Sequence, residues 1–415
     1  MRFKNHHLLV FCAGAIIFTI LIISHGIYSF DSSVILIDEK WQKIIQRRQR
    51  EVNESVGCHD FLDKLKTKIP VSVLLIDLTI LELIGKSKCD QLKLYETPIE
   101  WERNAGGRGR RFHNDNYRLV ATSIRKDLNF IPRDLFQPFF FEVNQQKDYL
   151  ELDTKPRRII PKSFETVKFG NLAVPLKPFR FRKFWEKSRL IECSNSTVHR
   201  KETDKKRKIN LELAVFELSR LQNLMIQYDM FPFISEGTLL GWYRECSIIP
   251  HTQDIDISVF ASEFNPKFVD DMRSGRSIFR LSRRLGKLDA LEMTVAPRQG
   301  YHVNTDIFLM YQETNETTEI DFNWISGLKG DGERLRYHFP LFEPICSADL
   351  LGHLVWTTCD PEKAIIHEYG ERWFEDIPTK NYSWFESVYN VQRNVEWFSN
   401  WELSKIKFED GYPTK

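Results

Sequence analysis

The feature that most constrains this chain is a short run in which acidic and branched apolar residues alternate, Asp254 to Val259 (DIDISV). Side chains alternate between the two faces of a β-strand, so Asp254, Asp256 and Ser258 point one way and the apolar residues point into a core. At ~3.3 Å per residue the aspartate Cα atoms lie ~7 Å apart, within reach of one divalent cation. Two carboxylates this close repel each other unless a cation or a proton lies between them. The run therefore predicts a strand with a metal site on one face.

A glycine-threonine pair precedes this strand. Gly237 and Thr238 open the run Leu239 to Arg244, which lacks proline and predicts a helix. The first N–H groups of a helix have no partner within it and bind phosphate oxygens. Arg244, three residues beyond Gly241, can hold a phosphate through its bidentate guanidinium, or it can form a surface salt bridge instead. We therefore expect Gly237, Thr238, Gly241 and Arg244 near the phosphates of a donor substrate.

A third carboxylate lies in a later apolar segment, Tyr301 to Tyr311 (YHVNTDIFLMY). Burying an ionised carboxylate costs several kcal/mol unless it is paired or binds a metal, so Asp306 is the candidate third ligand. The alternative is a strand-end acid that faces water. Asp321 (EIDFNW) competes for the role, but the nearby Asn323, Gly327 and Gly330 favour a turn there.

Other polar and aromatic residues near these motifs have two interpretations each. His251 is expected in a turn rather than as a ligand or base. Glu292 either supports the metal ligands or faces solvent from a strand. Tyr369 and Trp373 can stack on a base or sugar, but their four-residue spacing favours packing on one face of a helix.

The string GTLLGWYRECSIIPHTQDIDI, followed by TDIFLMY, resembles the fukutin/LicD-like phosphotransferase family, which is built on a nucleotidyltransferase fold. The resemblance extends through EYGERW (368–373) and, more weakly, back to VSVLLIDL (71–78). It implies that Asp254, Asp256 and Asp306 are the catalytic and metal-ligating carboxylates and that Gly237 and Thr238 contact the donor phosphates.

The chain departs from the bacterial members of the family at one place. They usually carry Trp-Asp-Asp between the proline and the Asp-x-Asp pair, whereas His251, Thr252 and Gln253 follow Pro250 here. This difference argues against a choline-phosphate specificity taken from the bacterial members and fits the fukutin side of the family.

The resemblance also implies an activity. A fukutin-like enzyme uses Mg²⁺ or Mn²⁺ and a nucleotide-activated alcohol, CDP-ribitol, and transfers ribitol 5-phosphate to a glycan on a glycoprotein acceptor. Three alternatives stay open: transfer of another phospho-group such as phosphocholine or a sugar phosphate, a UDP-sugar glycosyltransferase, and a non-catalytic luminal scaffold. Replacing Asp254 would leave the function of a scaffold intact. Homo-oligomers and complexes with related transferases are both compatible with the sequence.

The apolar run near the N-terminus predicts a membrane anchor, because it reaches the ~20 residues that cross a bilayer and basic residues precede it. A cleaved signal peptide is the competing interpretation. The anchor makes the chain a single-pass type II protein of the Golgi or endoplasmic reticulum membrane, with its catalytic part luminal. We predict a cytosolic tail (1–7), the transmembrane signal anchor (8–28), a stem (29–68), an N-terminal luminal domain (69–194), a basic linker (195–209) and a LicD/fukutin-like catalytic domain (210–415).

The expected fold class is α+β, with a mixed sheet and flanking helices in the catalytic domain and a mixed domain before it. Prolines at 132, 138, 161, 175 and 178 favour short strands in the first domain. Helical spacing of apolar residues begins the second, at Leu211, Leu213, Ala214, Phe216, Leu218, Leu221, Leu224 and Met225.

The charge and the cysteine content indicate which ligands and which cellular compartment to expect. The formal net charge is only +2, so the chain lacks the basic field of a nucleic-acid-binding protein. Of the 7 cysteines, Cys12 lies in the apolar run. The remaining cysteines are even in number, as in a disulfide-bonded luminal protein, and allow fifteen full pairings. Cys346 with Cys359 is the best local candidate for a pair.

Overall fold

The computed structural model describes residues 209–409 without interruption and, before them, residues 73–75, 118–122, 136–162, 166–169, 172–175, 177–196 and 198. The chain divides into two compact units between Arg189 and Leu190. The predicted tail, anchor and stem (1–7, 8–28 and 29–68) lie outside the described residues, as does most of the predicted linker. Within the described part of the chain, no helix is long and apolar enough to cross a membrane.

The first unit contains a mixed sheet of short strands, as its prolines predict. Strands β1, β2 and β3 run parallel, and β4 and β5 continue the sheet in antiparallel fashion. Strands β6 and β7 form a separate hairpin, and helix α6 begins at a proline, which suits the first position of a helix because that N–H needs no partner. The elements are β1 (Val73–Leu75), β2 (Arg118–Thr122), β3 (Phe136–Val143), β4 (Tyr149–Leu152), β5 (Arg158–Pro161), β6 (Thr166–Phe169), β7 (Leu172–Pro175) and α6 (Pro178–Glu186).

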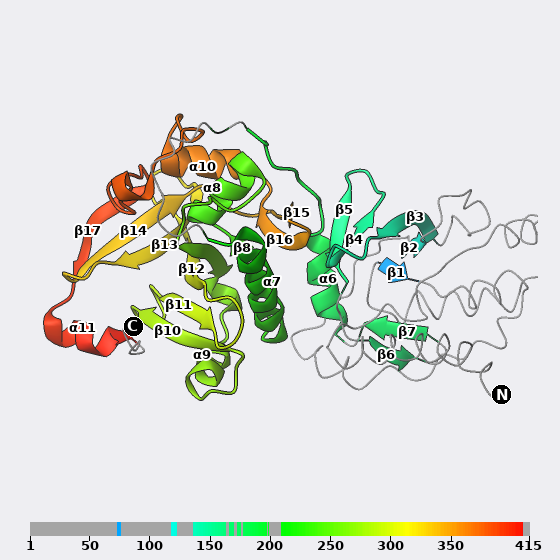
Figure 1. Cartoon of the computed structure of the whole chain (residues 1–415), viewed down its shortest axis with the longest axis horizontal. Helices are drawn as coiled ribbons and strands as arrows, with labels where there is room; N and C mark the ends of the chain where they lie inside the picture. Colours follow the sequence, from blue (N-terminus) through cyan, green and yellow to red (C-terminus); the bar gives the residue numbers. More distant parts are fainter. Residues whose placement is uncertain are drawn as a thin grey trace, which may run out of the picture. The chain divides into compact units, whose positions relative to one another are not determined.

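The second unit is built on a larger mixed sheet (Figure 1). Its main path runs β17-β14-β13-β12-β11-β10-β18, and β9 pairs with β12 while β8 pairs with β9. Strands β15 and β16 form a hairpin. The strands are β8 (Phe233–Ile234), β9 (Asp254–Phe260), β10 (Phe279–Leu285), β11 (Glu292–Pro297), β12 (Asn304–Thr314), β13 (Asp321–Leu328), β14 (Glu333–Phe339), β15 (Ile345–Leu350), β16 (His353–Thr358), β17 (Val391–Trp397) and β18 (Lys407–Glu409).

Helices flank this sheet, and α8 lies beside α10 and against β9 (Figure 1). Each helix carries sequence signals at its start, such as the Asn210 side chain that accepts the Leu213 N–H at 3.0 Å. The described helices of this unit are α7 (Leu211–Gln227), α8 (Glu236–Glu245), α9 (Pro266–Arg273), α10 (Pro361–Tyr369) and α11 (Asn400–Ile406), with short 3₁₀ turns at Ala261–Glu263 and Thr379–Asn381. The observed architecture confirms the α+β fold class.

The helix predicted from the apolar spacing after residue 210 is α7, which packs against β16. Ala214, Leu218 and Leu221 are buried in the core as expected. The prediction was wrong for Leu213 and Phe216, which are 45% and 49% exposed. Both lie on the solvent side of the helix, so the apolar residues form a wider band than the buried face.

Two disulfides lie in the second unit. Cys346 bonds to Cys359, which confirms the predicted local pair and ties the two ends of the β15-β16 hairpin together. Cys193 bonds to Cys246, the residue that ends α8. The sequence did not single out this second pair, because its partners lie 53 residues apart.

Candidate active site

Strands β9 and β12 bring the predicted acids together. The two strands are parallel, and the Cα of Asp256 is the register partner of the Cα of Asp306. Asp254 lies two residues before Asp256 and on the same face of β9, while Ile255 and Ile257 are buried on the other face. The alternation predicted for β9 is therefore confirmed, and so is the position of Asp306 near the start of an apolar strand.

The N-terminus of α8 is fixed against the middle of β9. The Thr238 hydroxyl accepts the Asp256 backbone N–H at 2.8 Å, and the Ser235 N–H donates to the Asp256 carbonyl at 3.3 Å. The buried hydroxyls of Ser235 and Ser258 lie 2.9 Å apart in a hydrogen bond. Thr238 thus positions the strand that carries the acids.

Gly237 allows the helix to approach Asp256 closely. A Cβ atom at position 237 would lie 3.0 Å from Oδ2 of Asp256, closer than ordinary van der Waals contact. Glycine therefore leaves room for the carboxylate beside the first turn of α8. Both Gly237 and Thr238 lie at the site; contact with a donor phosphate stays a prediction for each.

Glu236, the first residue of α8, is a site residue that the sequence reasoning missed. Its φ is +43°, a left-handed conformation that costs about 1–3 kcal/mol for a residue other than glycine. Both of its carboxylate oxygens are buried and have no hydrogen-bond partner. The hydroxyl of Ser235, the preceding residue, forms its hydrogen bond with Ser258. The available signal was an acid directly before the Gly-Thr pair.

Burial raises the pKa of several acids at this site. It raises the pKa of Glu236 to about 8, with the charges of Asp306 and Glu292 adding to the effect. It raises the pKa of Asp256 well above its usual range, with Asp254, Glu236 and Asp306 as neighbouring charges. The pKa of Glu368, a buried residue of α10, is raised by its burial and by Glu236. The carboxylates are thus close enough to disfavour one another's ionisation.

Arg283 of β10 and Thr294 of β11 contact this group of acids. Arg283 Nη2 lies 2.7 Å from Glu292 Oε1 and 3.6 Å from Asp306 Oδ2, and the Thr294 hydroxyl donates to Asp306 Oδ1. Burial raises the pKa of Asp306 to about 6 although Arg283 and Thr294 lower it. Burial likewise raises the pKa of Glu292 to about 8 against the effect of Arg283.

Glu292 is therefore not a solvent-facing strand residue, because its side chain is buried beside Asp306. The observed place agrees with the other interpretation, in which it supports the acids. Sequence reasoning missed Arg283 altogether, since one of several arginines in a strand carries no distinguishing signal.

The donor atoms at this site suit a hard divalent cation. Carboxylate oxygens are the ligands that Mg²⁺ and Mn²⁺ prefer, and the unpartnered oxygens of Glu236 lack a positive or donating group. Within residues 209–409 and the shorter described stretches, no three Asp, Glu, His or Cys side chains converge closely enough to hold a metal as they stand. The fit therefore rests on ligand chemistry and on the missing partner of Glu236.

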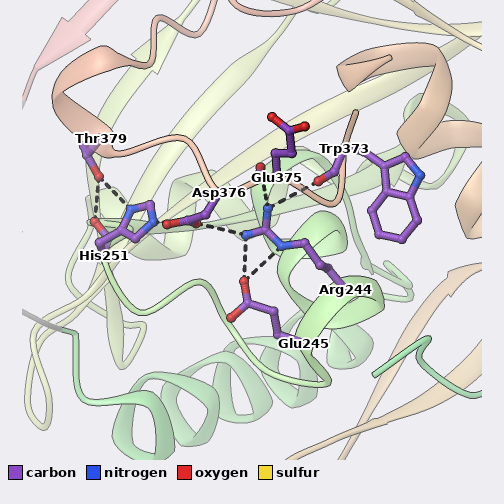
Figure 2. A network of polar contacts seen from close by, with 7 residues as sticks. All are labelled: Arg244, Glu245, His251, Trp373, Glu375, Asp376 and Thr379. Carbon is purple, nitrogen blue, oxygen red and sulfur yellow. Dashed lines mark hydrogen bonds and ion pairs between the residues drawn. The ribbon is translucent and has the colours of Figure 1, made fainter. Parts of the chain in front are cut away.

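The guanidinium of Arg244 is bonded inside the fold, so the structure gives no support to the phosphate contact predicted for it (Figure 2). Its side chain is buried, and all five of its N–H groups point at internal acceptors. Nε and Nη2 donate to Glu245 Oε1 at 3.1 and 2.6 Å, Nη2 also lies 3.4 Å from Asp376 Oδ1, and Nη1 donates to the carbonyls of Trp373 and Glu375 at 3.3 and 3.2 Å. The alternative of a surface salt bridge was wrong.

Gly241 is explained by packing rather than by phosphate contact. A Cβ atom there would lie 2.8 Å from the Ile249 backbone N and 2.9 Å from the Ser247 carbonyl O. The glycine lets α8 lie against the turn that leads to β9. Arg244 also has a structural role, because its hydrogen bonds hold the segment around Asp376 against the C-terminal end of α8.

The remaining candidates divide between the two interpretations. His251 lies in a turn, as expected, and its ring nitrogens bond to Asp376 and Thr379 at 2.9 Å each (Figure 2). Trp373 packs on Tyr243 with ring centroids 5.5 Å apart, which agrees with a packing role. The expected shared helix was wrong, because α10 ends at Tyr369 and Gly370 follows with φ +75°.

Asp321 lies far along the strands from the acid cluster. It begins β13, opposite Thr314 at the last position of β12, and accepts the Thr314 hydroxyl at 2.6 Å. The turn predicted at Asp321 was wrong, since the turn precedes it. Its place at the far end of β12 from Asp306 separates it from the other acids.

Two family models match the chain. Residues 57–192 match the W02B3.4-like N-terminal domain, and residues 228–359 match the LicD/FKTN/FKRP nucleotidyltransferase domain. The second match includes α8, β9, β11 and β12, and therefore Glu236, Asp254, Asp256, Glu292 and Asp306 but not Glu368.

Similar proteins support both matches. The Caenorhabditis elegans protein W02B3.4 is 38% identical over 341 residues, which cover 82% of each chain, and T07A5.1 of the same organism is 36% identical over 92% of this chain and 96% of its own. Both are named as uncharacterized proteins. The Mus musculus protein named ribitol-5-phosphate transferase FKTN is 30% identical over 57% of this chain and 50% of its own. The chain therefore belongs to the W02B3.4-like family and, through the domain at residues 228–359, to the fukutin/LicD-like family.

Proposed function

We propose that this chain is a phosphotransferase that moves ribitol 5-phosphate from CDP-ribitol to a hydroxyl of a protein-borne glycan. The coarser part, transfer of a phosphate-containing group onto a glycan, is supported by the LicD/FKTN/FKRP domain and by the similarity to fukutin. The choice of ribitol 5-phosphate is supported by the fukutin relatives, which are named ribitol-5-phosphate transferases. The observation that carries the proposal is the alignment of Asp254, Asp256 and Asp306 beside the N-terminus of α8.

The chain's own residues have distinct tasks in this proposal. Asp254, Asp256 and Asp306 would hold Mg²⁺ or Mn²⁺, which supplies positive charge to the donor diphosphate and to the departing CMP. The first N–H groups of α8, at Glu236, Gly237 and Thr238, have no acceptor inside the helix and favour anionic oxygens. Arg283 offers a further positive charge beside Asp306.

The reaction is an in-line displacement. An oxygen of the acceptor hydroxyl attacks the phosphorus that carries ribitol, and the bond from that phosphorus to the bridging oxygen of CMP breaks. The hydroxyl proton passes to one of the three aspartate carboxylates, and CMP leaves with the bridging oxygen. The products are the ribitol-phosphate diester of the glycan and CMP.

The cellular location of the protein is also a proposal. We place the protein in the Golgi or endoplasmic reticulum membrane through the apolar run at 8–28, with the catalytic unit in the lumen. The two disulfides support an oxidising compartment, because cytosolic thiols are kept reduced.

A donor panel tests the function. The full chain in mild detergent is incubated with Mn²⁺ or Mg²⁺, a glycan acceptor and CDP-ribitol, CDP-choline or UDP-sugars, while nucleotide release and acceptor mass are measured. We expect CMP release and a ribitol-phosphate mass gain with CDP-ribitol, and a loss of about 100-fold or more in Asp254→Asn. Asp321→Asn is the matched control, since that acid lies away from the site.

Two other outcomes would replace the proposal. UDP release with a sugar mass gain would identify a glycosyltransferase. Absence of turnover with every donor, in a preparation that also binds no cation, would favour the non-catalytic scaffold.

A further inference from the structure

We infer that Glu236 is a fourth carboxylate ligand of the divalent cation, so that the metal site includes the first residue of α8 as well as strands β9 and β12. This inference rests on the proposed function, because it adds a ligand to the cation that Asp254, Asp256 and Asp306 would hold. The string on which the resemblance to the family was based begins one residue later, at Gly237.

The first observation is that the Glu236 carboxylate is buried without a partner. Neither oxygen accepts a hydrogen bond, although buried polar atoms in proteins are nearly always paired. Asp306 has Thr294 and Arg283, and Glu292 has Arg283, whereas the oxygens of Glu236 have no partner and the adjacent Ser235 hydroxyl is bonded to Ser258. A buried acid without a donor is destabilising in either protonation state, and a cation would supply the missing partner.

The second observation is the position of Glu236 among the acids. Its neighbour Gly237 lies close to Asp256, because a Cβ atom there would be 3.0 Å from Oδ2 of Asp256. The Ser235 N–H, one residue before Glu236, donates to the Asp256 carbonyl at 3.3 Å, and the Thr238 hydroxyl, two residues after it, accepts the Asp256 N–H at 2.8 Å. The carboxylate of Glu236 is therefore part of the same group of charges as the acids of β9 and β12.

The third observation is the backbone conformation. Glu236 has φ +43°, which glycine adopts without strain and other residues adopt at a cost. Such conformations are common at functional sites, where the side chain has a role that the backbone geometry makes possible. A purely structural role for this position would be met better by glycine, which has neither the strain nor the unpartnered acid.

A cation-binding measurement tests the inference. Mn²⁺ is titrated into the full chain in detergent, and the bound ion is followed by electron paramagnetic resonance and by calorimetry. We expect Glu236→Gln and Glu236→Gly to weaken Mn²⁺ binding about 10-fold or more, with Asp254→Asn as the positive comparison. Glu371→Gln, which removes an exposed acid, is the control and should bind as the unmodified chain does.

The glycine variant separates a ligand from a structural residue. Glu236→Gly keeps the left-handed backbone, and its thermal unfolding without a cation shows whether it folds. If it folds and binds Mn²⁺ as tightly as the unmodified chain, Glu236 is not a ligand and the inference is wrong. If instead the unmodified chain and Asp254→Asn both fail to bind Mn²⁺, the metal-dependent function itself is wrong.

Discussion

Glu236 and Arg244 occupy opposite ends of the same helix, and the difference lies in the partners of their charged groups. Glu236 has buried oxygens that nothing in the described chain satisfies, whereas each N–H of Arg244 has an acceptor within 3.4 Å. A charged residue with all its hydrogen bonds made inside the fold contributes to structure. One without partners, next to other acids, indicates a missing ligand.

Replacing Arg244 should affect stability. Arg244→Lys places one ammonium where a planar guanidinium makes five hydrogen bonds to four acceptor atoms, so Asp376 and the two backbone carbonyls lose donors. We expect the free energy of unfolding to fall by about 1–3 kcal/mol, because buried acceptors lose their donors while the positive charge is kept. Denaturant unfolding measures this change.

Arg276→Lys is the control, because the Arg276 side chain is 65% exposed where it pairs with Asp271 and its loss should cost less than about 1 kcal/mol. An Arg244→Lys variant with unchanged stability and weakened donor binding would contradict this structural role and favour the phosphate contact predicted from the sequence.

At the scale of elements, the site is the meeting of one helix start with two parallel strands. Thr238 and Ser235 bond to the backbone of Asp256, so α8 and β9 move as one piece. In its middle, α8 packs through Gly241 against the turn before β9, and at its C-terminal end it is fixed by Cys246 through a disulfide to Cys193. The helix is thus held at both ends, which keeps its N-terminus aimed at the acids.

Gly241→Ala tests this packing by the sign of its effect. In a helix interior this change ordinarily stabilises by about 1 kcal/mol. Here the added methyl group would lie 2.8 Å from the Ile249 backbone N, so we expect a net loss of about 1–3 kcal/mol in unfolding free energy. Gly330→Ala, with nothing within 4 Å of its added Cβ, is the control. A stabilised Gly241→Ala variant that binds donor poorly would instead favour the predicted phosphate contact.

The sequence predicted the parts of the site that follow a local period. The two-residue alternation of β9 and the apolar run of β12 fix which face each acid takes, and a run without proline fixed α8. It did not predict the internal contacts of Arg244 or Gly241, since their partners lie in other segments, and Asp376 is 132 residues from Arg244. The left-handed φ of Glu236 was equally out of reach, because glutamate carries no local preference for it. The apolar spacing from Leu211 to Met225 falls within α7. Which of these apolar residues are exposed was not predicted, because solvent exposure depends on tertiary packing.

At the scale of the whole molecule, the folded chain keeps several acids in surroundings that disfavour their charge. Burial raises the pKa of Glu236 and Glu292 to about 8 and that of Asp306 to about 6, above their values of 4.5 and 3.8 in exposed groups. The folded state therefore binds more protons than the unfolded state from about pH 4 to about pH 8. The stability linked to these groups is fully present below that range and is lost as the pH rises through it.

Stability in EDTA should accordingly fall between pH 7 and pH 9. Glu236 and Glu292 each contribute about 1 kcal/mol to this fall, because the pKa of each is raised to about 8 in the folded state. Thermal unfolding at the two pH values measures it, and Glu236→Gln should show a smaller fall. Mn²⁺ should oppose the fall, because it binds the ionised carboxylates. A melting temperature that rises with pH in EDTA would contradict the raised pKa values of Glu236 and Glu292.

The most direct test of the central claim is whether donor binding needs the cation. CDP-ribitol is titrated into the full chain by calorimetry, without acceptor, once in Mn²⁺ and once in EDTA. If the acids act on the donor diphosphate through a divalent cation, binding is measurable in Mn²⁺, is lost in EDTA and is lost in Asp254→Asn. Equal affinity in EDTA and Mn²⁺, unchanged in Asp254→Asn, would show that these acids do not hold a cation for the donor.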